Sequence, residues 1–403
     1  LFIAARRTVQ TRLLTSEAFE TATRLTGVSP PDSERHRTVK RRSLRFAALP
    51  VALMLSLGVA ACDGDDKEEN GSSATTELSG TLAGAGASSQ GAAMEAWIAG
   101  FAAQAPDVTV TYDPIGSGGG RKQFISGGVQ FAGSDAYLKP EEIEAAKATC
   151  GPQGFIEFPG YISPIAVAYN LPGVEKLNLS PSVIARIFNN KITKWNDPAI
   201  AELNPGVQLP NLTITPVHRS DESGTTENFV DYLSKAAPRD WPYEVSGEWP
   251  IEGGEAAAQT QGVAAALRGG EGTIGYLDAS QATGLGVAAI QVGDSFVEYS
   301  PEAAAAVVDA AEKVTGRPRH SYAIDLPRDT TESGVYPIVL VSYQLACVNY
   351  DNQRTVDLVK AFLSYVISEE GQRAAAEHAG SAPISAELRA QAQAAIEAIS
   401  VAS

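Results

Sequence analysis

The segment HRSDESGTTENF, residues 218–229, places an arginine, two carboxylates and several small hydroxyl residues side by side. Apolar residues at helical spacing begin at Phe229. Ser223, Gly224 and Thr225 therefore lie where the first turn of a helix leaves backbone N–H groups without partners. These donors and the helix dipole attract anions, so the segment could be a catalytic loop, a helix cap or an anion-binding site.

Three other loops combine glycine with small hydroxyl residues ahead of a helical pattern. They are GAGASSQG at residues 84–91, GSGGGRKQF at 116–124 and AGSDAYLKPEEI at 132–143. Glycine lets the backbone approach a ligand closely, and Ser or Thr adds a hydroxyl donor. Because Ser, Thr and Asp are also the commonest N-cap residues, capping explains any single loop. The sequence does not show that the loops converge.

Other glycine-rich motifs fit these loops poorly. GAGASS has Ser89 in place of the third glycine of the dinucleotide fingerprint, and GSGGGRK lacks the second glycine and the Ser/Thr of a Walker A loop. None of the loops contains the G-x-S-x-G nucleophile elbow.

Length, composition and charge narrow the class of protein. The chain has 403 residues, 44% of them hydrophobic, which indicates a globular protein of two lobes or domains. A formal net charge of −16 argues against a nucleic-acid partner, because a phosphate-backbone binder needs a basic surface. Four scattered histidines and no C-x-x-C motif provide no ligand cluster for zinc.

The N-terminal region has the three-part pattern of a secretory signal. The basic run VKRRSLRF precedes AALPVALMLSLGVAAC, which resembles a bacterial lipoprotein signal because Val59, Ala60 and Ala61 precede Cys62. The resemblance implies cleavage before Cys62 and a diacylglycerol on its sulfur. The alternative is a buried helix with an incidental cysteine.

The residues on either side of this signal are polar. Residues 1–38 have no place in it, and we expect an upstream extension with the true start near Val39. The charged run after Cys62 is predicted to be a flexible tether over 62–77. Residues 1–61 carry ten Lys/Arg and four Asp/Glu, so the chain after them keeps 21 basic and 43 acidic residues and a net charge of −22.

Short β-rich runs alternate with helical patterns along the rest of the chain. VTVTYDPI, GTIGYL and YPIVLVSYQLACV are typical of strands, and helical spacing recurs over residues 94–101, 184–188 and 358–366. This alternation predicts an α/β architecture with largely parallel sheets. The apolar runs YISPIAVAYN and YPIVLVSYQLA are core strands or the two segments that cross between lobes, near Ala168 and Leu340.

Cys150 and Cys347 are the cysteines left after the signal. Outside the cytoplasm, two thiols that lie close together tend to form a disulfide. The sequence leaves open whether these two are bonded or are separate buried thiols.

Seven motifs, in this order over residues 78–380, resemble the phosphate-binding lipoproteins of high-affinity ABC phosphate importers. They are GAGAS, IGSGGG, FAGSDA, YISPIAVAYNLPG, IFNNKITKWNDPAI, VHRSDESGTT and GTIGYL. The resemblance implies a type II periplasmic-binding-protein fold of two α/β lobes joined by a two-strand hinge. Lobe I would comprise residues 78–167 and 340–403, and lobe II residues 168–339.

The same resemblance implies a function and a location. The protein would bind inorganic phosphate in the cleft between the lobes and deliver it to the transmembrane subunits of an ABC permease. It would be a monomer without a cofactor or enzymatic activity, held by the lipid on Cys62 at the outer face of the cytoplasmic membrane.

Carried over residue by residue, the resemblance also implies a site. Asp221 matches the carboxylate that pairs with the site arginine. Two positions depart from the family, in which many members have an aromatic residue in place of Ser89 and glycine in place of Glu222. Glu222 either adds negative charge near the site or is solvated. The implied phosphate-binding residues are Ser88, Ser89, Ser117, Asp135, Arg219, Ser223, Gly224 and Thr225.

Asp135 would discriminate between oxyanions. Phosphate near neutral pH still carries a proton that it can donate to a carboxylate, whereas sulfate carries none and would be repelled. Arsenate also carries a proton, so this argument does not exclude it. The alternative role of Asp135 is to cap the following helix, and the alternative for Arg219 and Asp221 is a surface ion pair of little energetic worth.

Two other functions remain as alternatives. A secreted phosphatase or phosphoryl-transfer enzyme would need a nucleophile with a base, or a pair of metals, and Ser88, Ser223 and Thr225 have no set of histidines nearby. A binding protein for another oxyanion would keep the same design with a different ligand.

Overall fold

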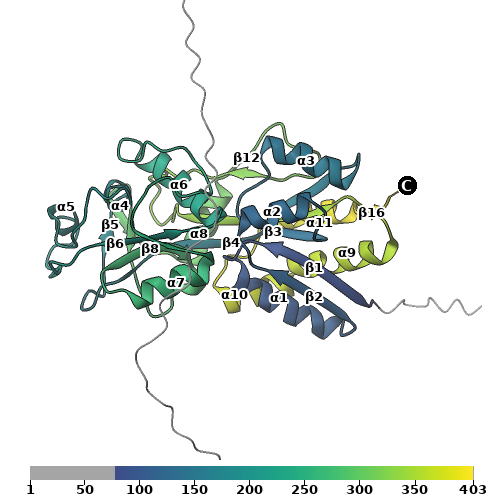
Figure 1. Cartoon of the computed structure of the whole chain (residues 1–403), viewed down its shortest axis with the longest axis horizontal. Coiled ribbons are helices and arrows are strands. Elements are labelled where there is room, and N and C mark those ends of the chain that lie inside the picture. The colour runs from purple at the N-terminus through teal and green to yellow at the C-terminus, as the bar shows by residue number, and fades with distance from the viewer. Residues whose placement is uncertain (1–77, 403) are drawn as a thin grey trace, which may run out of the picture. The chain divides into compact units, whose positions relative to one another are not determined.

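A computed structural model of the chain describes residues 78–402 (Figure 1). The predicted extension and signal at residues 1–61, the lipidation of Cys62 and the tether at 62–77 lie outside the described residues. Among the described residues, helices surround a nine-stranded mixed sheet. None of these helices has both the length and the apolar character needed to cross a membrane.

The main sheet has the strand order β2, β1, β3, β14, β4, β8, β6, β7, with β9 also paired to β4. Its strands are β1 (Gly80–Gly86), β2 (Val108–Asp113), β3 (Phe131–Ser134), β4 (Phe155–Asn170), β6 (Thr215–Arg219), β7 (Glu255–Ala257), β8 (Thr273–Asp278), β9 (Gly286–Val287) and β14 (Val339–Cys347). The smaller sheets are formed by β5 (Asn178–Leu179), β10 (Ala289–Val292) and β11 (Ser295–Val297); by β12 (Glu312–Lys313) and β13 (Ile324–Asp325); and by β15 (Asn349–Tyr350) and β16 (Ser400–Val401).

Eleven α-helices and one 3₁₀ helix are present among the described residues. Figure 1 shows helices on both faces of the sheet, with α2 and α1 on opposite faces at one end and α6 and α7 at the other. The helices are α1 (Gly91–Gln104), α2 (Ser117–Ile125), α3 (Pro140–Cys150), α4 (Pro181–Phe188), α5 (Pro198–Ala201), α6 (Gly224–Ala236), α7 (Gln259–Gly269), η1 (Ala279–Gln281), α8 (Pro301–Asp309), α9 (Gln353–Ile367), α10 (Glu369–Ala379) and α11 (Ala386–Glu397).

The sheet is parallel at its two ends and antiparallel in its centre. β1 pairs in parallel with β2 and β3, and β6 pairs in parallel with β7 and β8. The pairs β3–β14, β14–β4 and β4–β8 are antiparallel. We call β2, β1 and β3 with α1–α3 the β1 side, and β8, β6 and β7 with α6 and α7 the β8 side. The prediction of largely parallel sheets therefore holds for each side but not for the centre.

The centre is antiparallel because two long strands there connect the sides. β4 pairs with β14 through Phe155–Pro164 and with β8 through Ile165–Asn170, and all but the last of its 16 residues are buried. The apolar runs YISPIAVAYN and YPIVLVSYQLA are thus core strands, within β4 and largely within β14. A strand buried on both faces needs this continuous apolar sequence, since neither face meets water.

Amphipathic helices pack on the sheet as their spacing predicts. Met94, Trp97 and Phe101 form the buried stripe of α1, and the Trp97 indole N–H donates to the Gly371 carbonyl at 2.9 Å. The predicted helices over 184–188 and 358–366 correspond to α4 and α9.

Cys150, at the end of α3, and Cys347, at the end of β14, form a disulfide with their Cα atoms 5.1 Å apart. The bond settles the alternative that the sequence left open. It connects the β1 side to the crossing strand over a separation of 197 residues.

Removing this disulfide should destabilise the fold. Because the bond closes a long loop, the double substitution Cys150→Ala/Cys347→Ala is expected to lower the free energy of unfolding by about 2–4 kcal/mol. Urea unfolding followed by circular dichroism measures the change. Reductant should destabilise the unmodified protein similarly and leave the double variant unaffected. Equal unfolding midpoints for the two proteins would contradict the expectation.

Candidate anion-binding site

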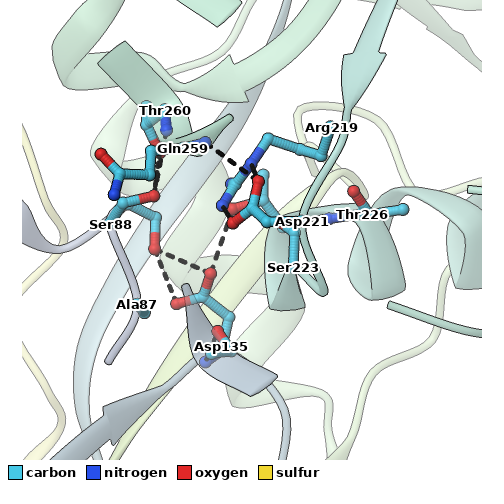
Figure 2. Close-up of polar contacts among 12 residues, drawn as sticks. Ala87, Ser88, Asp135, Arg219, Asp221, Ser223, Thr226, Gln259 and Thr260 are labelled. Carbon is cyan, nitrogen blue, oxygen red and sulfur yellow. Dashed lines mark hydrogen bonds and ion pairs between the residues drawn. The ribbon is translucent and has the colours of Figure 1, made fainter. Parts of the chain in front are cut away.

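The ends of parallel strands bring the predicted loops to one place. β1 and β3 run in parallel with Gly86 opposite Gly133, so the loops after them, with Ser88 and Asp135, leave the sheet at the same edge. On the other side, Arg219 ends β6 and lies in the parallel ladder with β7. Figure 2 shows Asp135 facing the Arg219–Asp221 pair, with the Ser88 hydroxyl directed at Thr260.

The carboxylate of Asp135 is where hydroxyl groups from three segments meet. Ser89 Oγ donates to its two oxygens at 2.8 and 2.7 Å, Thr225 Oγ1 donates at 3.1 Å, and Ser342 Oγ donates at 2.5 Å. Ser89 belongs to the β1 side, Thr225 to α6 on the β8 side, and Ser342 to the crossing strand β14. The aspartate is only 3% exposed, so these hydroxyl groups replace the water that a charged carboxylate requires.

Burial raises the pKa of the Asp135 carboxyl above its ordinary value. Hydrogen bonds from Ser342, Ser89 and Thr225, and the positive charge of Arg219, offset only part of this rise. The group is therefore easier to protonate than an exposed aspartate.

Arg219 supplies a buried positive charge beside this carboxylate. Its Nε donates to Asp221 Oδ1 at 2.7 Å, and a terminal N–H donates to Oδ2 of the same carboxylate. Asp221 Oδ1 also accepts the Gln259 backbone N–H at 2.9 Å. Although burial acts to raise the pKa of Asp221, the hydrogen bond and charge of Arg219 outweigh it and lower that pKa. Because the arginine is 3% exposed, the alternative of a surface ion pair is wrong.

Of the remaining predicted residues, Ser88 and Gly224 contact the opposite side, and Ser117 contacts Asp135 on its own side. Ser88 Oγ accepts the Thr260 backbone N–H at 3.0 Å, which places the β1 side against the start of α7. Ser117 Oγ accepts the Asp135 backbone N–H at 3.1 Å. A Cβ atom on Gly224 would lie 2.6 Å from both Ser117 Oγ and Asp135 Cβ. Glycine is therefore required there for α6 to approach the opposite loop.

Helix capping explains one of these residues and not the others. Ser223 is the N-cap of α6, and its Oγ accepts the Thr226 N–H at 3.2 Å. α1 and α2 begin after Gln90 and Gly116 without side-chain caps. α3 begins at Pro140 with Lys139 as its N-cap, so the alternative in which Asp135 caps the following helix is wrong.

All eight predicted binding residues and Asp221 are thus placed in one region, but two contributors were missed. Ser342 and Gln344 interrupt an otherwise apolar core strand, so a polar residue in such a run is a usable signal, although it does not single out Ser342. Thr260 carries no comparable signal, because it lies in the first turn of an ordinary alanine-rich helix.

A cavity of about 570 Å³ reaches Asp135 beside α6. Its lining includes Asn228 and Arg328, and the Asn228 amide donates to the Asp135 carbonyl at 2.8 Å.

Known proteins are similar to this chain in sequence and in fold. A family model described as a PBP superfamily domain matches residues 71–370. Phosphate-binding protein PstS 3 of Mycobacterium leprae is 35% identical over 338 residues, which cover 80% of this chain and 90% of the relative. The chain belongs to the PstS family of phosphate-binding proteins. PstS of Haemophilus influenzae, another relative, is 34% identical over 274 residues, 66% of this chain and 78% of its own length.

Solved structures agree with the PstS assignment at the level of fold. A high-affinity periplasmic phosphate-binding protein bound with phosphate has a TM-score of 0.64 at 20% identity, covering 78% of this chain and 93% of its own. A phosphate-binding protein from Stenotrophomonas maltophilia has a TM-score of 0.61 at 20% identity, covering 78% and 94%. The predicted α/β, two-lobed type II periplasmic-binding-protein fold is confirmed.

A second buried carboxyl, Asp278, lies at the end of β8. The Tyr161 hydroxyl donates to both of its oxygens at 3.2 Å, and the Ser280 backbone N–H donates at 3.0 Å. Burial raises the pKa of Asp278 to about 7, and the nearby negative charge of Asp135 adds to the rise.

This shift predicts how stability depends on pH. A carboxyl whose pKa is raised on folding binds more protons in the folded state, so stability falls as pH rises from about 4 to about 7, by at most about 1.4 kcal/mol per pH unit for one group. Asp278→Asn should remove this contribution and be more stable than the unmodified protein above pH 7. Urea unfolding at a series of pH values measures the difference between the two proteins. The exposed Asp309→Asn is the control, and parallel curves for unmodified and Asp278→Asn proteins would contradict the expectation.

Proposed function

We propose that this protein binds inorganic phosphate at the hydroxyl-lined cluster around Asp135 and delivers it to the transmembrane subunits of an ABC permease. The observation that carries the proposal is the buried Asp135 carboxylate, an acceptor surrounded by donors from both sides of the sheet. Membership of the PstS family supports it, since the named relatives are phosphate-binding proteins.

The proposed ligand contacts are chiefly neutral donors. Phosphate oxygens would accept hydrogen bonds from the hydroxyl groups and from backbone N–H groups in the first turns of α1, α2 and α6, which have no intrahelical partners. These contacts would come from Ser88, Ser89, Ser117, Ser223, Gly224 and Thr225.

Arg219 would add the full positive charge, in a geometry suited to two oxygens. Asp221 holds the guanidinium in place and neutralises part of its charge. Although the chain is acidic, the anion would be bound by hydrogen bonds and one oriented cation at the site. Its binding would therefore not depend on the net charge of the chain.

Asp135 would set selectivity. When ionised, its carboxylate accepts a hydrogen bond from the protonated oxygen of phosphate. Sulfate would bring a second unprotonated oxygen against a buried negative group, which costs several kcal/mol, enough for roughly 10³-fold selectivity.

We further propose that β4 and β14 form the hinge, with lobe I at residues 78–167 and 340–403 and lobe II at 168–339. The change of β4 partner from β14 to β8 between Pro164 and Ile165 supports a boundary near this point. Closure would bury the ion and present a surface that the permease senses. The protein would act as a monomer at the cell surface, anchored through lipid on Cys62 to the outer face of the cytoplasmic membrane.

The arrangement of His218 favours binding over catalysis. Its ring nitrogens lie 2.9 Å from the Arg219 carbonyl oxygen and 3.2 Å from that of Gly253, and its ring stacks on Trp249 with centroids 5.1 Å apart. The imidazole is thus engaged with the backbone and with Trp249, and is not placed as a base for a serine nucleophile.

Titration calorimetry of residues 62–403 with phosphate, sulfate and arsenate tests the proposal. We expect tight binding of phosphate, measurable binding of arsenate, and no heat of binding with sulfate. Asp135→Asn should bind sulfate, because the amide can donate to an unprotonated oxygen. Its selectivity for phosphate over sulfate should fall by at least about 10²-fold. Lowering the pH should also reduce selectivity, since the raised pKa of Asp135 favours its protonated form.

The exposed Asp294→Asn is the matched control and should keep full selectivity. Sulfate competing equally with phosphate in the unmodified protein would exclude the proposed role of Asp135. Hydrolysis of a model phosphate ester would instead support the enzymatic alternative.

A further inference from the structure

Glu222 reaches across the cluster from one side to the other. It stands between Asp221 and Ser223 in the loop that joins β6 to α6, on the β8 side. Its carbonyl oxygen accepts the Gly118 backbone N–H at 3.2 Å, from the first turn of α2. A Cβ atom on Gly118 would lie 2.2 Å from Glu222 Cδ. The backbone and the side chain of Glu222 therefore both contact the β1 side.

The Glu222 carboxylate ends between two cations of α2. Its Oε1 accepts from a terminal N–H of Arg121 at 3.0 Å, and its Oε2 accepts from Lys122 Nζ at 2.7 Å. Arg121 is 1% exposed and the Glu222 side chain 20%, whereas Lys122 is largely in solvent. The pair with Arg121 is thus shielded from water, and the pair with Lys122 contributes less.

Contacts within the β1 side hold the Arg121 side chain independently of Glu222. Its Nε donates to the two oxygens of Glu142 at 2.9 and 3.1 Å, and a terminal N–H donates to Ser134 Oγ at 3.1 Å. Glu142 in turn accepts the Lys139 backbone N–H at the start of α3. If the sides separated, the guanidinium would stay with α3 and β3, and its contact with Glu222 would break.

Glu222 is ionised at neutral pH. Burial acts to raise its pKa, but the hydrogen bond with Lys122 and the charges of Arg121 and Lys122 outweigh burial and lower that pKa below its ordinary value. This answers the question that the sequence left open, because the carboxylate is paired and not simply solvated.

We propose that Glu222, together with Arg121 and Lys122, is a clasp that holds the two sides of the site closed and slows release of the bound anion. The effect on release rests on the proposed phosphate function. The covalent neighbours of Glu222 are the partner of Arg219 and the N-cap of α6, so withdrawal of this loop from α2 would take binding groups with it. The other contacts between the sides, Ser88–Thr260, Thr225–Asp135 and Asn228–Asp135, involve neutral donors. The clasp joins full charges, and its solvent-exposed pair with Lys122 is the part that salt screens most.

A simple electrostatic view predicts the opposite result. If Glu222 acted only as a negative charge near the anion, its removal would strengthen binding and slow dissociation. The clasp instead predicts that Glu222→Gln speeds dissociation. The sign of the change therefore separates the two explanations.

Stopped-flow measurement of phosphate dissociation at low and high salt is the first test. Glu222→Gln should raise the dissociation rate constant roughly three- to tenfold at low salt, with little change in association, and should abolish most of its salt dependence. Lys122→Met should have a smaller effect in the same direction, and the two substitutions together should be less than additive. The exposed Glu298→Gln is the matched control.

Small-angle X-ray scattering of the ligand-free protein is the second test, and it does not depend on phosphate binding. Glu222→Gln at low salt should have a larger radius of gyration than the unmodified protein, which should approach the same value at high salt. Slower or unchanged dissociation in Glu222→Gln, or identical scattering from both proteins at low salt, would overturn the clasp. Absence of phosphate binding in the unmodified protein would refute the proposed function, and scattering would still decide whether the clasp exists.

Discussion

The arrangement of the site depends on the need to satisfy one buried carboxylate. Asp135 takes its donors from residues 46, 90 and 207 positions away in the chain, in a loop after β1, in α6 and in β14. A charged group without such partners would be strongly unfavourable in the interior. The two sides of the sheet and the crossing strand must therefore come together for Asp135 to be accommodated, and the absence of a side chain at Gly224 makes room for this approach.

The sequence predicted the parts of this site that are encoded locally. Glycine and hydroxyl residues ahead of helical patterns located Ser88, Ser117 and the start of α6, because a helix terminus depends on only a few neighbouring residues. Ser342 could not be placed in this way. The pairing of β14 with β4 shifts register between Ser342 and Tyr343, and such an irregularity changes which face a side chain takes.

Long-range arrangement limited the other predictions in the same way. Whether Glu222 is solvated depends on where α2 lies relative to the loop before α6, and nothing within either segment specifies that distance. The parallel pattern was predicted from alternating strands and helices, which describes each side correctly. The antiparallel centre arises because the chain crosses between sides through β4 and returns through β14, a topological fact that local patterns do not carry.

The disulfide between α3 and β14 has a consequence for the hydrogen-bond donors that Asp135 would keep if the two sides separated. Cys150 ends the helix that follows Asp135, and Cys347 lies in the same strand as Ser342. The bond therefore ties the helix that follows Asp135 to the strand that carries Ser342, whereas Thr225 lies in α6 on the β8 side. If the sides separated, the hydrogen bonds of Asp135 with Ser89 and Ser342 would remain, and the one with Thr225 would break. Asp135 would then keep two of its three hydroxyl donors, one of them from a strand that the disulfide ties to the helix after it.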